Sequence, residues 1–203
     1  MIVSTSETTK KLKKDLAFIA YIDRLKNVIR VNALFDASRA ENTAEHSWHA
    51  ATSALILAPY AEGDVDIDRV IRMLLIHDLI EIEAGDIFAY AEPEVLAQQE
   101  QLENEAAEVV FTQVSSPRGE ELRALWDEFE ARITPDAKFA KAIDRLLPIY
   151  SNIYNGGELW KQHKVSLAQV QENVAIIREG SARLADLVDE LVLMAAQEGL
   201  LIT

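Results

Sequence analysis

The sequence predicts an all-α protein that forms a single-domain helical bundle. Among its 203 residues only seven are glycine, and no segment alternates apolar and polar residues at a period of two. Several segments instead place apolar residues at steps of three and four, as one face of a helix requires. Hydrophobic residues make up 49% of the chain, which is enough for a substantial core.

The first two helices are expected before residue 60. One apolar face of the first helix is formed by Leu12, Leu16, Ile19 and Ile22. A polar stretch at 36–42 separates it from the second helix. Asn42 followed by Glu45 is a capping box, in which each residue satisfies a backbone N–H of the other, so the second helix begins there. Pro59 marks its end.

A third helix is expected from about Asp68 to Ile82, with Gly85 as its terminator. It is apolar on most sides, because it contains Val70, Ile71, Met73, Leu74, Leu75, Ile76, Leu79 and Ile80. A helix of this kind is normally buried in the middle of a bundle.

Later helices are expected at 93–114, 119–132 and 135–155. The last of these opens with Thr134-Pro135, a capping residue followed by proline at the first helical position. Ser166-Leu-Ala-Gln169 is a second capping box, and Gly180 interrupts the helix that it begins. A final helix runs to Gly199.

No linker or internal repeat divides the chain, so residues 1–203 are expected to form one domain. Its core would comprise about residues 12–160, with C-terminal helices at 166–199 packed on it.

Composition restricts the cellular setting. The chain has no cysteine, which excludes disulfides, zinc–thiolate sites and cysteine nucleophiles and fits a reducing cytoplasm. The polar, Lys-rich stretch from Met1 to Asp15 lacks the apolar run of a signal peptide, and no later segment has the roughly 18–20 apolar residues that span a bilayer. The formal charge of −14 repels a phosphate backbone. We therefore expect a cytoplasmic protein that binds neither nucleic acid nor membrane.

His77 and Asp78 interrupt the apolar run of the third helix, and Glu81 follows one turn later. Burying an unpaired carboxylate costs several kcal/mol, so each needs a cation or hydrogen-bond donors. Glu81 is four residues from His77 and three from Asp78, so we expect it on the same side of the helix as both. An isolated His-Asp pair also arises by chance, as a core histidine bonded to a backbone carbonyl beside an aspartate near the helix end.

Two further residues point to a metal site. His46 opens the preceding helix, and Asp144 lies within another apolar pattern. Together with His77 and Asp78 they offer two imidazoles and two carboxylates from three helices, which suits one divalent ion. Imidazole ligands favour Mn²⁺, Co²⁺, Fe²⁺ or Zn²⁺ over Mg²⁺. His49 would pack or support a ligand.

Other metal and nucleotide motifs are absent from the sequence. It contains no His-Glu-x-x-His, no Glu-x-x-His, and neither the Walker nor the dinucleotide glycine motif. His163, near a predicted loop beside Trp160, is interpreted as a surface or packing residue.

Three segments resemble a known family in their order. They are Glu41-Asn-Thr-Ala-Glu-His46-Ser-Trp-His49, His77-Asp-Leu-Ile-Glu81-Ile-Glu-Ala-Gly-Asp86 and Ala142-Ile-Asp144-Arg-Leu146. This set resembles the HD-domain metal-dependent phosphohydrolases, most closely the branch of 5′-deoxynucleotidases that act on deoxyribonucleoside monophosphates. The resemblance covers roughly residues 12–160 and implies an HD-type helical bundle.

The resemblance also implies roles for single residues. The metal ligands would be His46, His77, Asp78 and Asp144. Glu81 would assist the attacking water, Asp86 would lie at the substrate pocket, and Arg30 would orient the phosphate. Val31 stands where family relatives have tryptophan. We therefore expect no contact between an aromatic ring at this position and the base or sugar. Arg39 is a second basic candidate, or else a solvated loop charge.

The function expected from this resemblance is release of phosphate from a nucleoside or deoxynucleoside 5′-monophosphate, by a homodimer. A metal would polarise a phosphoryl oxygen and acidify a water whose proton Glu81 accepts. Three alternatives stay open: an HD-fold phosphodiesterase or pyrophosphohydrolase acting on another nucleotide, a metal- or nucleotide-binding module without turnover, and a purely structural bundle.

Overall fold

The computed structural model describes residues 6–203, and most of them are helical. Its helices and strands, in chain order, are α1 (Glu7–Ile22), the 3₁₀ helix η1 (Asp23–Asn27), β1 (Ile29–Ala33), β2 (Ala40–Asn42), α2 (Thr43–Leu57), the 3₁₀ helix η2 (Ala58–Tyr60), α3 (Ile67–Ile76), α4 (Glu81–Ala84), α5 (Pro93–Phe111), α6 (Arg118–Ala131), α7 (Pro135–Tyr154), α8 (Glu158–His163), α9 (Leu167–Gly180) and α10 (Ala182–Gln197). The expected all-α class is confirmed.

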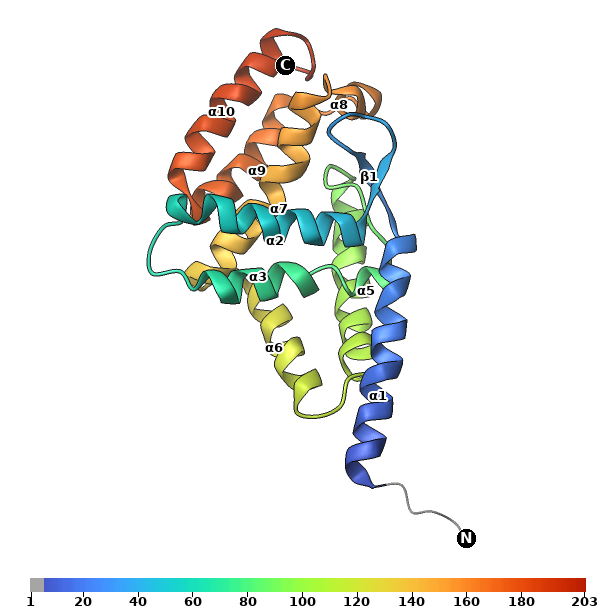
Figure 1. The fold of residues 1–203 in the computed structure, drawn as a ribbon. Helices are drawn as coiled ribbons and strands as arrows, with labels where there is room; N and C mark the ends of the chain where they lie inside the picture. Colours follow the sequence, from blue (N-terminus) through green and yellow to red (C-terminus); the bar gives the residue numbers. More distant parts are fainter. Residues whose placement is uncertain (1–5) are drawn as a thin grey trace.

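Helix α7 is the centre of the bundle. It contacts α2, α3 and α6 on one side and α9, α10 and α8 on the other, and α2 lies beside α3. In Figure 1, α1 and α5 lie together along one edge, and α1 and α10 occupy opposite ends of the molecule. Helices α9 and α10 therefore pack on the earlier helices as expected for 166–199, while the assignment of the whole chain to one domain stays a prediction.

Among the residues that the structure describes, the buried apolar side chains form two clusters. The larger surrounds α7 and includes Phe139, Ile143, Trp160 and Val192. The smaller joins α1 to the region after α3 and to α5 and α6, and includes Phe18, Leu79, Val110, Phe111 and Trp126. The two clusters meet at the end of α3, because Ile76, its last residue, packs against both.

The local start and stop signals are confirmed. The Asn42 side chain accepts the Glu45 N–H, and the Glu45 carboxylate accepts the Asn42 N–H. Ser166 and Gln169 form the second capping box. Helix α9 ends at Gly180, where a β-carbon would lie 2.4 Å from the carbonyl oxygen of Lys138, so glycine permits the close approach of α9 to α7.

The expected third helix is wrong in its second half. Helix α3 stops at Ile76, and residues 77–80 form tight turns before the short helix α4. The N–H groups of Leu79 and Glu81 bond to the carbonyls of Ile76 and Asp78, three residues back rather than four. His77, Asp78 and Glu81 are therefore presented by a turn and not by one helical face.

One element and one surface differ from expectation. Strands β1 and β2 pair as an antiparallel hairpin, where the sequence predicted no strand. His163 is the last residue of the short helix α8, beside the turn at Lys164. The apolar face of α1 is solvent-exposed in the single chain, with Leu12 and Leu16 each 56% and Ile19 61% exposed, whereas Phe18 is buried.

Across residues 6–203, the helices are too short or too polar to cross a membrane.

Candidate metal centre

His77 presents one ring nitrogen to the interior of the site. Its Nδ1 lies 2.8 Å from the carbonyl oxygen of Leu74, and since a carbonyl only accepts, Nδ1 must carry the proton. Its Nε2 is buried and has no hydrogen-bond partner among the described residues. The ring is fixed on one side by Phe129, 5.0 Å between centroids, and Trp126 Nε1–H donates to the His77 carbonyl at 3.0 Å. The Nε2 lone pair is therefore held free to bind a cation.

His46 and Asp144 meet this nitrogen from α2 and α7. His46 Nε2 lies 3.1 Å from Asp144 Oδ1, and the same oxygen lies 3.5 Å from His77 Nε2. The other His46 nitrogen, Nδ1, faces Glu41 Oε2 at 3.5 Å. His46, His77 and Asp144 are all buried. Each histidine thus directs Nε2 inward while Nδ1 faces an acceptor that orients the ring.

These three residues form a group that can hold a metal ion, because their ligand atoms all lie within 4.8 Å of one another. Ligand atoms about 2.0–2.2 Å from a common ion lie roughly 3 Å apart, which suits the 3.1 and 3.5 Å separations here. Asp78 lies against the same group, with Oδ1 3.1 Å from His77 Nε2 and Oδ2 4.0 Å from His46 Nε2. The residues present therefore fit a metal ion.

The negative charges of Asp78 and Asp144 favour a positive charge in this group. Burial alone would raise the pKa of Asp78 and of Asp144, yet the neighbouring histidines hold both below their usual range. Burial would lower the pKa of His77, but Asp78 and Asp144 outweigh it and raise that pKa to about 10. The same negative potential that draws a proton to His77 would draw a metal cation in its place.

Glu81 lies beside the group without belonging to it. Its carboxylate is buried, and the Thr43 hydroxyl donates to its Oε2 at 2.7 Å. Burial and the nearby charge of Asp78 raise the pKa of Glu81 well above its usual value, although Arg30 opposes the shift. A carboxylate in this state readily accepts a proton.

Arg30, on β1, is surrounded by carboxylates. Its Nη1 donates to Asp78 Oδ2 at 3.0 Å and lies 3.5 Å from Asp86 Oδ1 and 3.9 Å from Glu81 Oε1. Its Nε lies 3.6 Å from Glu41 Oε2. Burial would lower the pKa of Arg30, but these carboxylates outweigh burial and raise it. The side chain is therefore held in place by four acidic partners.

Asp86 closes the site on the hairpin side. The backbone N–H of Val31 donates to its Oδ2 at 3.0 Å. Burial raises the pKa of Asp86 above its usual value, although Arg30 and this N–H oppose the shift. The hairpin thus positions Arg30 and Val31 against Asp86, in a segment for which the sequence predicted no strand.

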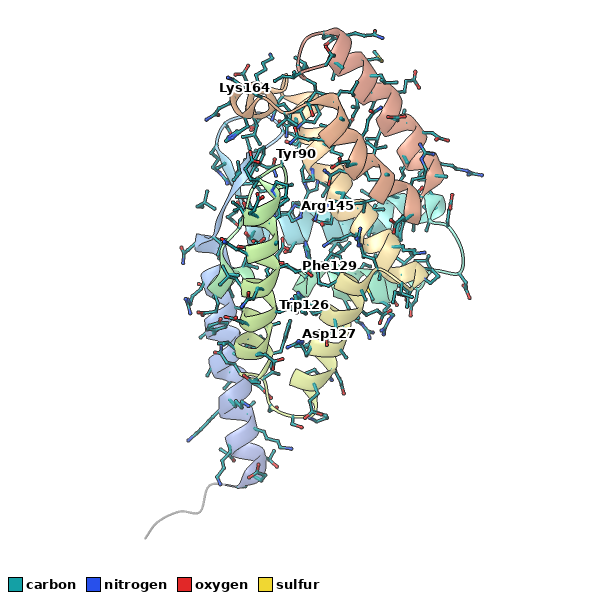
Figure 2. All side chains as sticks on the ribbon, turned by 180° about the vertical axis from the view of Figure 1, so that it is seen from behind. Tyr90, Trp126, Asp127, Phe129, Arg145 and Lys164 are labelled. Carbon is teal, nitrogen blue, oxygen red and sulfur yellow. The ribbon has the colours of Figure 1, made fainter. Side chains whose placement is uncertain are left out.

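A cavity of about 760 Å³ opens over these residues. Arg30, His77, Asp78, Glu81, Asp86 and Asp144 all line it, as do residues of α5, α6, α7 and α9. This volume lies in the range of small-molecule sites. Figure 2 shows the side of the molecule on which Tyr90, Arg145, Phe129 and Trp126 follow one another between the helices.

Several residues of the site were not predicted to function there. They are Glu41, Thr43, Trp126, Lys141 and Arg145. Lys141 carries a signal in the sequence, since it lies three residues before Asp144 on one helix, and its Nζ is 3.8 Å from Asp144 Oδ2. Thr43 and Trp126 reach the site from other elements, and no local pattern marks them.

Three other residues of the sequence analysis lie outside the group. The His49 ring packs at 5.5 Å from Phe35. The His163 ring packs at 4.5 Å from Phe88. Arg39 is exposed and binds both oxygens of Glu45, at 2.8 and 2.7 Å, so it is a loop charge that supports a helix cap.

Comparison with known proteins gives a family and a close fold. A family model described as an HD domain matches residues 22–185. The structure is similar to the crystal structure of a "Predicted metal-dependent phosphohydrolase" from Magnetospirillum magnetotacticum, with a TM-score of 0.92 and 43% sequence identity. That match covers 98% of this chain and 100% of the other.

Curated relatives are more distant. The chain is 28% identical over 131 residues to the human 5′-deoxynucleotidase HDDC2, which covers 64% of this chain and 62% of the human protein. It is 27% identical over 157 residues to the 5′-deoxynucleotidase hdd1 of Schizosaccharomyces pombe, covering 70% and 77%. The chain thus spans less than two thirds of the length of the human relative.

Proposed function

Because the chain belongs to the HD-domain family, we propose that it is a metal-dependent phosphohydrolase that releases phosphate from nucleoside or deoxynucleoside 5′-monophosphates. The observation that carries the proposal is the buried group of His46, His77 and Asp144, which lies at the cavity with Glu81 beside it. The substrate class is suggested by relatives that are named 5′-deoxynucleotidases.

The proposed ligands of one divalent ion are His46, His77, Asp78 and Asp144. The two imidazole nitrogens favour Mn²⁺, Co²⁺, Fe²⁺ or Zn²⁺ over Mg²⁺. Asp78 is the fourth member because its Oδ1 is 3.1 Å from His77 Nε2, although Arg30 shares its other oxygen. When bound, the ion supplies Lewis acidity at a phosphoryl oxygen and lowers the pKa of a water.

Glu81 is proposed to orient the attacking water and accept its proton. The Thr43 hydroxyl fixes Oε2, which leaves Oε1 on the side of Arg30, 3.9 Å from Nη1. Because burial and the charge of Asp78 raise the pKa of Glu81 above its usual value, its carboxylate is a stronger base than an exposed one. Arg30 and Asp86, which line the cavity beside the metal group, are proposed to contact the substrate.

The test is phosphate release from a panel of nucleoside and deoxynucleoside monophosphates, with each divalent metal added back after chelation. We expect Glu81→Gln to retain metal but lose on the order of 10²–10⁴ in kcat, the usual contribution of a positioned base. Glu83→Gln is the matched control, since Glu83 is more exposed and contacts Tyr21 and Arg24 instead.

The outcomes separate the alternatives. Unchanged release by Glu81→Gln would reject the assigned role. The absence of phosphate release with every metal would reject the proposed nucleotidase activity. Turnover of cyclic nucleotides or dinucleoside pyrophosphates in place of monophosphates would favour another HD-fold hydrolase.

Two further proposals concern the setting of the protein. A homodimer is supported by the exposed apolar face of α1, formed by Leu12, Leu16 and Ile19, which a second chain would cover. Light scattering that gives the mass of one chain at micromolar concentration would reject it. The proposed cytoplasmic location is checked by cell fractionation.

A further inference from the structure

Arg145 is a cation of the cavity wall whose side chain forms no hydrogen bond with the residues at 6–203. It follows Asp144 on α7 and lines the cavity. Its Nε is buried and unpartnered among residues 6–203. Its side chain as a whole is 31% exposed, so part of it is accessible to solvent. A buried donor without a partner is unfavourable in the folded protein.

The other cations near the metal group are already engaged. Arg30 is held by four carboxylates at 3.0 to 3.9 Å. Lys141 donates to Glu130 at 3.2 Å and lies over the Phe129 ring at 4.2 Å. By contrast, the only ion pair of Arg145 in the described part of the chain is with Asp144, at 3.7 Å. Of the three cations that contact carboxylates of the metal site, Arg30, Lys141 and Arg145, Arg145 therefore has the most unused hydrogen-bonding capacity.

Asp144 places Arg145 next to the metal group. One carboxylate oxygen, Oδ1, faces the Nε2 atoms of His46 and His77. The other, Oδ2, faces Lys141 and the Nε of Arg145. The guanidinium and the two imidazoles thus contact opposite oxygens of a single carboxylate.

The surroundings of Arg145 favour an anion as its external partner. Acidic residues that share the cavity, including Glu103, Glu130 and Glu172, lie more than 4 Å from its nitrogens in the described structure. In Figure 2 Arg145 is labelled between Tyr90 and Phe129, and it lines the cavity. A planar guanidinium presents paired N–H groups that match two oxygens of a phosphate.

We propose that Arg145 binds the phosphate of the substrate from the α7 side, as a second cation in addition to Arg30. This inference rests on the proposed phosphohydrolase function and assigns a contact within that site. Arg30 would mainly hold Asp78, Glu81 and Asp86 in place, while Arg145 supplies donors that form no hydrogen bond within the described part of the chain.

The test measures binding of inorganic phosphate to the Mn²⁺-loaded protein by calorimetry, which needs no turnover. We expect Arg145→Gln to weaken phosphate binding at least tenfold and to raise KM for a nucleoside monophosphate, with metal content and melting temperature unchanged. Arg145→Lys keeps the charge but loses the fork, so its affinity should be intermediate. Arg132→Gln is the control, because Arg132 lines the same cavity and loses the same charge.

Wild-type phosphate affinity in Arg145→Gln would overturn the proposal. An equal loss of phosphate affinity in Arg132→Gln would also overturn it, because any positive charge at the cavity would then contribute as much as Arg145. If Arg145→Gln does not fold, phosphate affinity of Arg145→Lys equal to wild type overturns it and a reduced affinity supports it. Failure of the proposed function looks different. In that case no nucleotide is hydrolysed, although phosphate binding still depends on Arg145.

Discussion

Replacing Glu41 by glutamine should weaken metal binding although Glu41 is not a proposed ligand. Its Oε2 lies 3.5 Å from His46 Nδ1 and 3.6 Å from Arg30 Nε, and its side chain is only 12% exposed. The carboxylate orients the imidazole and makes it a stronger ligand. Losing such a partner lowers metal affinity by about 10–100-fold, or roughly 1.4–2.7 kcal/mol. We expect the lower end for Glu41→Gln, because the amide oxygen still accepts a hydrogen bond, and the upper end for Glu41→Ala.

The assay is competition for Co²⁺ or Mn²⁺ between the apoprotein and a chromophoric chelator. Glu45→Gln is the matched control, since Glu45 lies four residues later, binds Arg39 at the surface, and is replaced by a residue that also completes a capping box. Its metal affinity should equal wild type. Affinity within twofold of wild type for both Glu41 variants would refute the reasoning, because His46 would then need no orienting carboxylate.

Two further predictions concern stability. Burial raises the pKa of Glu103 from 4.5 to about 7, so the folded state favours its protonated form and stability is lost as pH rises between these values. In urea unfolding of the apoprotein, the free energy of unfolding of Glu103→Gln relative to wild type should therefore be higher at pH 8 than at pH 5, by on the order of 1 kcal/mol after allowance for solvent screening. An equal difference at both pH values would contradict this. Gly180→Ala should lower the free energy of unfolding by about 1–3 kcal/mol, because its β-carbon would lie 2.4 Å from the Lys138 carbonyl oxygen. Glu179→Ala is the control on the same helix. Equal unfolding midpoints for the two variants would exclude this close contact.

Much of the fold was predictable because its signals are local. The capping boxes at Asn42 and Ser166, the Thr134-Pro135 start and the stop at Gly180 each depend on backbone groups within a few residues, so the sequence contains the whole interaction. The same holds for the all-α class, since helical periodicity is a property of consecutive residues.

The metal group was predictable for a different reason. His77 and Asp144 are polar residues in apolar helical patterns, and such residues need partners wherever they are buried. His46 and Asp144 lie 98 positions apart, so residue types and helical patterns only suggested that the two share a site. The ordered set of motifs, through its family resemblance, supplied that link.

The remaining features were decided by tertiary packing. The apolar residues from 67 to 82 are compatible with one continuous helix, yet the chain turns after Ile76. At this point the two core clusters meet, and the Trp126 indole N–H donates to the His77 carbonyl. The hairpin that places Arg30 pairs residues 13 apart at Ile29 and Asn42, which no local pattern specifies.

The sequence by itself determined most of the helices, the ends that carry local signals and the residue types that can hold a metal. Only the tertiary structure decided which charges are satisfied. It surrounds Arg30 with carboxylates and leaves Arg145 with one distant partner, although both are arginines near acidic residues. The physical reason is that ion pairing depends on distances of a few ångströms between separate elements, and these distances are set by packing rather than by local sequence.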